Sequence, residues 1–116
     1  MLHPADHAMT PDDSMSPRVR LALDNMWPGV YEAARKHLAV IEEFLLAGTA
    51  STTAQHLAAS SSAHRLSGNL GMFGRRDASS VAAAIEALLA KDSSTTQAEL
   101  RSLVDRLDGL LGTTTQ

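Results

Sequence analysis

Residues 63–74 of this 116-residue chain read AHRLSGNLGMFG and place one histidine among side chains that are small or absent. The apolar residues around this stretch recur at steps of four and three, which is the spacing of one face of an α-helix. These residues are Ala59, Ala63, Leu66, Leu70 and Phe73. His64 lies about 100° from them around the helix axis. The spacing therefore predicts a helix with a buried apolar stripe and an imidazole that projects beside it.

The helix neighbours of His64 are the second informative feature of this stretch. The residues one turn away are Ser60, Ser61, Ser67 and Gly68, and Gly71 follows about two turns on. A glycine in a helix interior costs about 1 kcal/mol relative to alanine, so stability alone does not explain this choice. We interpret the small residues as clearance for a molecule that approaches the imidazole. Gly71 could instead permit close helix packing, and Gly74 fits a helix C-cap.

The composition restricts the classes of protein. The chain is 44% hydrophobic and 3% aromatic, with alanine and leucine dominant, which favours helices. It contains no cysteine, so disulfides and thiolate sites are excluded. A formal net charge of −3 gives no basic footprint for nucleic acid. No apolar stretch approaches the ~18 residues of a membrane span, and no signal peptide is recognisable, so we expect a cytoplasmic protein.

The pattern along the chain predicts one all-α domain, an antiparallel up-down-up-down four-helix bundle with a short additional N-terminal helix. We expect a flexible tail over residues 1–16, the bundle over 17–112 and a second tail over 113–116. Pro28 is expected to separate the short helix, which ends near Trp27, from a long helix that Gly48 closes. Further helices are expected over residues 52–73, 76–90 and from a capping box at Thr96 and Glu99 onward.

Apolar residues at helical spacing predict the inner faces of the other three helices. On the first and the additional helix they are Leu23, Met26, Trp27, Val30, Ala34, Leu38, Ile41 and Leu45. On the third long helix they are Ala78, Val81, Ala82, Ile85, Leu88 and Leu89. On the last helix they are Leu100, Leu103, Val104, Leu107, Leu110 and Leu111.

The stretch around His64 resembles the histidine-containing phosphotransfer (HPt) domain family. Members carry A-H-x-L-K-G-s-s-x-x-L-G on the second long helix of a four-helix bundle, and one sub-branch has a form closer to A-H-K-L-A-G-S-L-G-T-F-G. The matching positions here are Ala63, His64, Leu66, Gly68 and Gly74, then Ala78, Ala82 and the pair Ile85-Glu86 on the next helix. The resemblance covers about residues 18–112, and its joint spacing is more specific than any single element.

The resemblance implies a phosphorelay protein with His64 as the phosphoryl acceptor and donor. Its partner would be a response-regulator receiver domain, a hybrid histidine kinase or both. The receiver would bring Mg²⁺, so the chain itself would need no metal or cofactor. Neutral imidazole is a nucleophile near pH 7, which suits this role. No kinase motif is present, so we expect a phosphoryl carrier, not an enzyme, and a monomer.

The phosphoryl environment implied by this reading consists of Arg65, Ser67, Gly68, Ser60, Ser61 and Gly71. Ser67 stands where the family often has a lysine, which places a positive charge beside the phosphorylated ring. Arg65 could supply charge, although its Cα direction is rotated by about 100° from that of His64.

Two other functions remain open at this point. A degenerate HPt fold could serve as a docking module that works without phosphorylation, which Ser67 would favour. A plain helical scaffold could also oligomerise through its glycine face. For His64 itself, the alternative is a surface histidine without a task. His3 and His7 lie in a proline-containing stretch, so a zinc site there is not expected.

Overall fold

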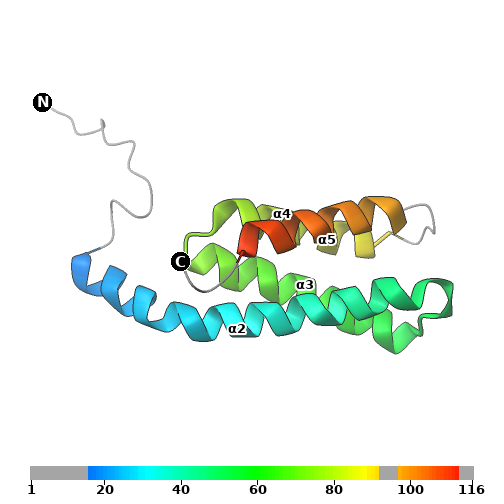
Figure 1. Ribbon diagram of the computed structural model, residues 1–116, viewed down its shortest axis with the longest axis horizontal. Coiled ribbons are helices and arrows are strands. Elements are labelled where there is room, and N and C mark those ends of the chain that lie inside the picture. The colour runs from blue at the N-terminus through cyan, green and yellow to red at the C-terminus, as the bar shows by residue number, and fades with distance from the viewer. Residues whose placement is uncertain (1–15, 92–96, 113–116) are drawn as a thin grey trace, which may run out of the picture.

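The computed structural model describes residues 16–91 and 97–112 and shows helices throughout these ranges (Figure 1). The elements are α2 (Pro17–Ala47), a 3-10 turn η2 (Gly48–Ala50), α3 (Thr53–Met72), α4 (Arg76–Leu89) and α5 (Gln97–Leu111). Within the described ranges there is no β-strand. The prediction of an all-α chain with four main helices is confirmed. The predicted tails, apart from Ser16, and Thr96 of the predicted capping box lie outside the described residues.

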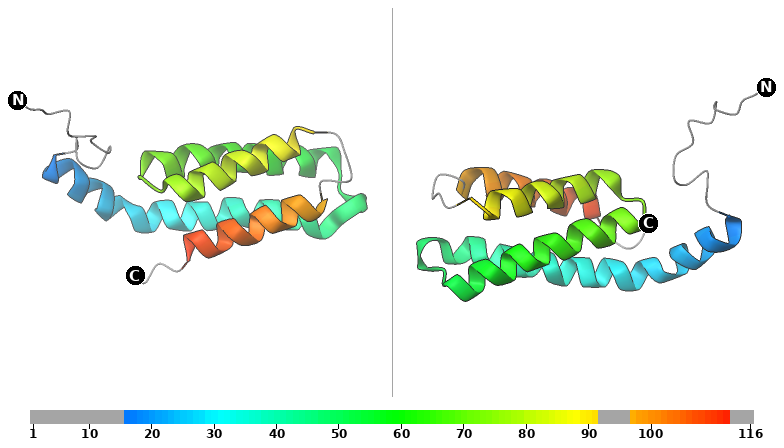
Figure 2. Two further views of the ribbon diagram at one scale, coloured as in Figure 1. Left: turned by 90° about the horizontal axis from the view of Figure 1, so that it is seen from above. Right: turned by 180° about the vertical axis from the view of Figure 1, so that it is seen from behind.

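The helices are grouped so that each packs on two others. α3 contacts α2 and α4, and α5 contacts α4 and α2. Figure 1 shows α2 along one long side of the molecule, with α3 beside it and α4 and α5 together on the other side. Figure 2 shows the same grouping from two further directions. The space enclosed by the four helices holds the core.

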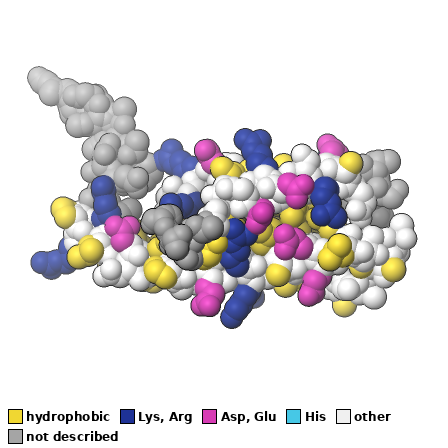
Figure 3. Space-filling view, in the orientation of Figure 1, with side chains coloured by type: hydrophobic (Ala, Val, Ile, Leu, Met, Phe, Trp, Pro, Cys, Tyr) yellow, Lys and Arg dark blue, Asp and Glu magenta, His cyan; other side chains and the backbone are white. Residues whose placement is uncertain are grey.

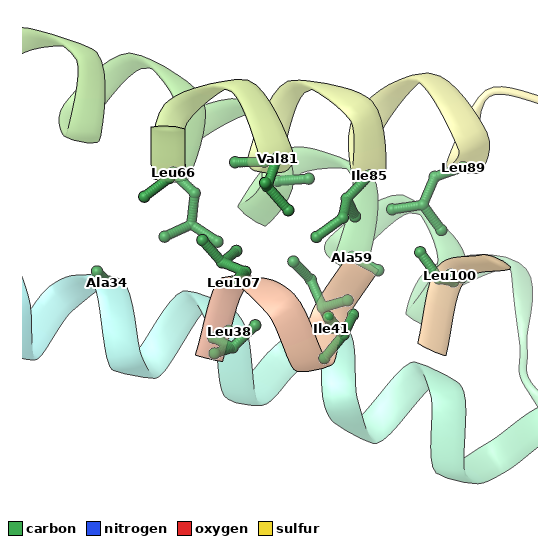
Figure 4. Close-up of a cluster of buried hydrophobic side chains, with 14 of the residues drawn as sticks. Ala34, Leu38, Ile41, Ala59, Leu66, Val81, Ile85, Leu89, Leu100 and Leu107 are labelled. Atoms are coloured by element: carbon green, nitrogen blue, oxygen red, sulfur yellow. The ribbon is translucent and has the colours of Figure 1, made fainter. Parts of the chain in front are cut away.

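The core is built from the apolar stripes that the sequence spacing predicts, because each helix of a bundle buries one face against its neighbours. Its largest fully buried side chains are Leu38, Ile41, Leu66, Leu70, Ile85, Val104 and Leu107. Figure 4 shows Leu38 and Ile41 of α2 pointing toward Leu107, with Leu66 and Ile85 on the opposite side. All six residues predicted for the inner face of α4 are buried. The stripe of α3 is buried from Ala59 to Leu70, and Phe73 is half-buried.

The predicted break at Pro28 is wrong, because α2 runs through this residue as one helix. Proline removes the amide hydrogen that would bond to the carbonyl of Asp24, four residues earlier. Both Asp24 and Pro28 are exposed, so solvent can reach that carbonyl. Figure 1 shows α2 bent, with its first turns inclined to the rest, as proline in a helix causes. The expected additional N-terminal helix is therefore the beginning of α2.

Two residues predicted for inner faces are exposed. Met26 lies in the first third of α2 and Leu110 lies near the end of α5. The buried residues of α2 begin only at Ala34, so the apolar stripe around Met26 is not covered. Leu110 instead lies at the edge of the α5 stripe, because the next residue, Leu111, is buried. Periodicity identifies the face of a helix but not where its partners end.

An aromatic cluster marks the level at which α2 meets the end of α3. The Trp27 ring lies 6.1 Å from the Phe73 ring and 6.2 Å from the Tyr31 ring, measured between centroids. The Arg75 guanidinium lies over Trp27, 4.0 Å from the ring centroid, at the distance of a cation–π contact. These contacts hold the connection between α3 and α4 against α2.

The end of α5 is tied to α2 by a polar cluster. The Tyr31 hydroxyl donates to the Gly112 carbonyl at 2.6 Å, and Arg35 Nε donates to the Tyr31 hydroxyl at 2.8 Å. Arg35 also forms an ion pair with Asp108 and donates to the Gly112 carbonyl. This cluster satisfies a carbonyl at the C-terminal end of α5, which has no partner within the helix.

The ends of α3 follow helix-capping rules. Thr52 and Gln55 form a capping box, with bonds of 3.1 Å and 2.8 Å between their side chains and backbone amides. At the other end Gly74 has a φ of 77°, a conformation that favours glycine. Its amide bonds to Gly71 O at 3.1 Å and the Arg75 amide bonds to Leu70 O at 2.9 Å, which is a Schellman motif. This confirms the capping interpretation of Gly74.

Within the described part of the chain, no helix combines the length and apolar character needed to cross a membrane.

Candidate functional site

His64 lies in the middle of α3 and projects into solvent. Its side chain is 75% exposed, whereas the adjacent Ala63 and the nearby Leu66 are fully buried. The burial of these two residues fixes the rotation of α3 about its axis and so holds His64 on the outside. The predicted relation between the apolar stripe and the imidazole is thus what the structure shows.

Glu86 of α4 is the polar partner of His64. Its Oε2 atom lies 3.1 Å from Nδ1 of the imidazole, within hydrogen-bond and ion-pair distance. A carboxylate accepts hydrogen bonds, so it favours the tautomer with the proton on Nδ1 and leaves the lone pair on Nε2. The sequence reading noted Glu86 within a family pair but did not assign it to the site. The sequence did contain a signal for this role of Glu86. Glu86 directly follows Ile85, which is fully buried on the inner face of α4, so Glu86 lies at the edge of that face.

The glycines of the site differ in what surrounds them. A Cβ atom on Gly68 would meet no atom within 4 Å, so nothing in the described chain requires glycine there. A Cβ atom on Gly71 would lie 3.2 Å from Ser79 Oγ of α4. Gly71 thus fits the packing alternative, while Gly68 leaves open space one turn after His64. Only Gly68 retains the clearance interpretation.

The serines predicted around the site occupy different levels of exposure. Ser61 is exposed, while Ser60 and Ser67 are half-buried. The backbone carbonyl of Ser67 accepts a hydrogen bond of 2.8 Å from the Ser79 hydroxyl, which ties α3 to α4 beside the site. Ser67, which stands where the resemblance places a lysine, thus lies at the junction of α3 and α4.

The charge of Arg65 acts on a residue of α2. Arg65 is exposed, and its positive charge contributes to the low pKa of His37, a half-buried residue of α2. Burial is the larger cause of that low pKa, because it disfavours the charged imidazolium. Arg65 thus influences His37 through its charge, while Glu86 is the charged residue that contacts His64.

Two exposed apolar residues flank His64 on the surface of α3. Leu57 and Met72 are 63% and 67% exposed. With Ser61 and Gly68 they follow steps of four, three, four and four through His64, so they share its side of the helix. Sequence analysis missed both, although their distances of seven and eight residues from His64 were a signal. The site is therefore a stripe along α3, with small residues next to His64 and a large apolar side chain at each end.

A metal centre finds no support in the described residues, which contain no group of three or more histidine, cysteine or acidic side chains placed to hold an ion. His3 and His7 lie outside the described residues. His56 has a structural environment, because its Nε2 lies 2.7 Å from the Leu89 carbonyl and its ring packs 5.4 Å from that of Phe44.

Comparison with protein families gives one match, to the model described as Hpt domain, over residues 29–113. Comparisons with curated proteins and with solved structures give no match. Hpt domains are phosphotransfer modules of two-component signalling, and they are phosphocarriers that interact with response-regulator receiver domains and kinases. The matched span includes α3, α4 and α5 entire, and with them His64 and Glu86. By the extent of this match, the chain belongs to the Hpt domain family.

Proposed function

We propose that His64 carries a phosphoryl group to or from the aspartate of a response-regulator receiver domain. The observation that carries this proposal is an imidazole that is 75% exposed and has its Nδ1 paired with Glu86. An exposed Nε2 with a lone pair is the group that such a transfer requires.

The proposed transfer is a displacement at phosphorus. The Nε2 lone pair forms a bond to the phosphorus of the phospho-aspartate while the bond from phosphorus to the carboxylate oxygen breaks. The aspartate leaves as a carboxylate, and no proton is transferred. The ring becomes an imidazolium that keeps its Nδ1 proton, and Glu86 stabilises the new positive charge. The reverse reaction returns the phosphoryl group to a receiver.

The surface around His64 fits a partner that approaches along α3. Ser61 and Gly68 leave room beside the ring, and the exposed Leu57 and Met72 provide apolar contact on either side. Apolar anchors beside a polar reaction centre are typical of interfaces that form specifically. We infer that the receiver covers this stripe during transfer.

The charge needed at the transferring phosphoryl group would come from the partner. The charge of Arg65 acts on His37 of α2, and Ser67 carries no charge. Phosphoryl transfer depends on cations that neutralise the equatorial oxygens. We infer that the Mg²⁺ ion of the receiver would supply this charge.

The test is transfer from phosphorylated receiver domains to the wild-type chain and to His64→Gln. His37→Gln serves as the matched control, since it removes another imidazole of the same bundle. We expect an acid-labile, base-stable phosphate on the wild type and on His37→Gln, and none on His64→Gln. Equal labelling of His64→Gln would contradict the proposal. Binding to a receiver without any label would instead support a docking module.

A further inference from the structure

The junction between α3 and α4 is closed, two turns from His64, by residues with very short side chains. The Ser79 hydroxyl of α4 donates a hydrogen bond of 2.8 Å to the Ser67 carbonyl of α3. Gly71 lies one turn after Ser67, and a Cβ atom there would lie 3.2 Å from Ser79 Oγ, closer than an ordinary van der Waals contact. The right-hand view of Figure 2 shows α3 and α4 side by side. Ser79 thus occupies the space that a side chain at position 71 would need.

The contact at Ser79 is in register with the pair of His64 and Glu86. Gly71 follows His64 by seven residues, and Ser79 precedes Glu86 by seven residues. Seven residues are about two helical turns, so each of the two pairs uses the same side of α3 and the same side of α4. The two contacts lie about 10 Å apart along the helices. Because packed helices transmit displacements over such distances, the helix separation at Ser79 affects the separation at His64.

The contact at Ser79 restricts the helix separation more tightly than longer side chains do. On the side of α2 and α5, the long Arg35 side chain pairs with Asp108, and Figure 3 shows basic and acidic side chains next to one another on this face. A long side chain has several rotatable bonds and can follow a shift of its helix. A serine has one, so its hydroxyl reaches the Ser67 carbonyl over only a narrow range of separations.

We propose that Ser79 is a positioning residue, which together with Gly71 holds α4 at the distance from α3 at which Glu86 pairs with His64. This inference rests on the proposed function, because the pairing prepares Nε2 of His64 for phosphoryl transfer. Glu86 is half-buried, so water competes with the imidazole for its carboxylate. A wider junction favours water and releases the proton on Nδ1 from its partner. Gly71 serves to admit the Ser79 hydroxyl and not to admit the receiver.

The first test reads the His64 ring in the free protein by nitrogen NMR and needs no phosphoryl transfer. Glu86→Ala provides the shifts of a ring without its partner. We expect Ser79→Ala and Gly71→Ala to move the ring nitrogen shifts of His64 from the wild-type values toward those of Glu86→Ala. Ser80→Ala removes an exposed hydroxyl from the next residue of α4, so it is the matched control and should keep the wild-type shifts. Circular dichroism verifies that each variant stays folded.

Gly68→Ala separates the effect of packing from that of proximity to the ring. Gly68 is nearer to His64 along α3 than Gly71 is, yet a Cβ atom on Gly68 would meet no atom within 4 Å. We expect Gly68→Ala to leave the His64 shifts of the free protein unchanged, whereas Gly71→Ala changes them. Equal changes in both variants would overturn the inference, because any added side chain on this surface would then disturb the ring.

The second test measures the rate of transfer from a phosphorylated receiver domain. A misplacement of about 1 Å can slow a reaction by about 100-fold, and a Cβ atom on Gly71 requires a shift of a few tenths of an ångström. We therefore expect Ser79→Ala and Gly71→Ala to slow transfer by about threefold or more, and Ser80→Ala to transfer as the wild type. In the background of Glu86→Ala, Ser79→Ala should cause no further loss, because it acts through Glu86.

The two measurements distinguish failure of this inference from failure of the proposed function. If the wild type accepts phosphate but the His64 shifts of Ser79→Ala and Gly71→Ala stay at the wild-type values, the contact serves stability alone and the inference is wrong. Changed shifts with an unchanged transfer rate, or a further loss in the Glu86→Ala background, would also overturn it. If the wild type accepts no phosphate while the shifts change as expected, Ser79 still positions the ring and the proposed function is wrong.

Discussion

The carboxylate of Glu86 reaches from α4 to Nδ1 of His64 on α3, across a gap of 22 residues in sequence. The two residues are held by different helices whose facing sides are buried, so their relative position is set by the core. A partner of this kind fixes both the tautomer and the orientation of a histidine ring. The nucleophile of the proposed transfer therefore depends on the packing of α3 against α4.

We expect Glu86→Gln to slow phosphoryl transfer to His64 by about 10-fold or more, because the amide cannot stabilise the imidazolium that forms. The rate is measured by rapid quench with a phosphorylated receiver, and nitrogen chemical shifts of His64 report its tautomer. Glu42→Gln, on the exposed side of α2, is the control. An unchanged rate would show that the pair has no part in transfer.

Gly68→Gln should leave the bundle folded and block transfer, because its side chain would occupy the open space one turn after His64. Stability should rise by up to about 1 kcal/mol, since glycine is a poor helix residue. Thermal unfolding and the transfer assay measure the two effects. Gly68→Ala provides the control with little added bulk. Transfer by Gly68→Gln at the wild-type rate would eliminate the clearance argument.

Replacement of Leu57 or Met72 by serine should weaken binding to the receiver by roughly 1 kcal/mol each, because apolar surface is lost from the proposed interface. Calorimetric titration with an unphosphorylated receiver measures the change. Leu46→Ser removes an equally exposed apolar side chain from outside the stripe and should bind as the wild type. Equal losses for all three variants would count against a specific docking stripe.

Leu66→Ala should lower the free energy of unfolding by roughly 2–5 kcal/mol, because Leu66 is fully buried among all the helices around the core. Leu57→Ala, nine residues earlier on the exposed side of α3, should change it by less than about 0.5 kcal/mol. Urea unfolding followed by circular dichroism measures both. A reversal of this order would mean that α3 is rotated.

The low pKa of His37 predicts how stability changes with pH. The unfolded chain takes up the His37 proton near pH 6.5, whereas the folded chain takes it up only at lower pH. This contribution is fully present above pH 6.5 and is lost as the pH falls through the pKa of the folded state. Arg65→Gln should raise the His37 pKa without restoring its ordinary value, because burial is the larger cause. Proton NMR titration measures the His37 pKa, and an unchanged value in Arg65→Gln would show that the Arg65 charge does not act on His37.

The core could be predicted from the sequence because burial follows helical periodicity residue by residue. The stripe around Leu66 and the inner face around Ile85 needed no information beyond spacing. The rotation of His64 away from the core follows from the same rule. A family resemblance then supplied the chemical role that we propose for it.

Other features depend on distances that no local pattern contains. The partner of His64 comes from another helix, and the charge of Arg65 acts on His37 of α2. Pro28 was misjudged because a helix tolerates proline where the freed carbonyl is exposed, which requires knowledge of the surface. The exposure of Met26 depends on where the other helices stop.

Trp27 is the only tryptophan of the chain, and it contacts both the Phe73 ring and the Arg75 guanidinium. Its ultraviolet fluorescence therefore arises from one place, beside the end of the helix that carries His64. A receiver seated over Met72 would change the polarity around the indole and shift its emission. The protein thus contains an intrinsic optical probe that can follow the proposed docking without a label.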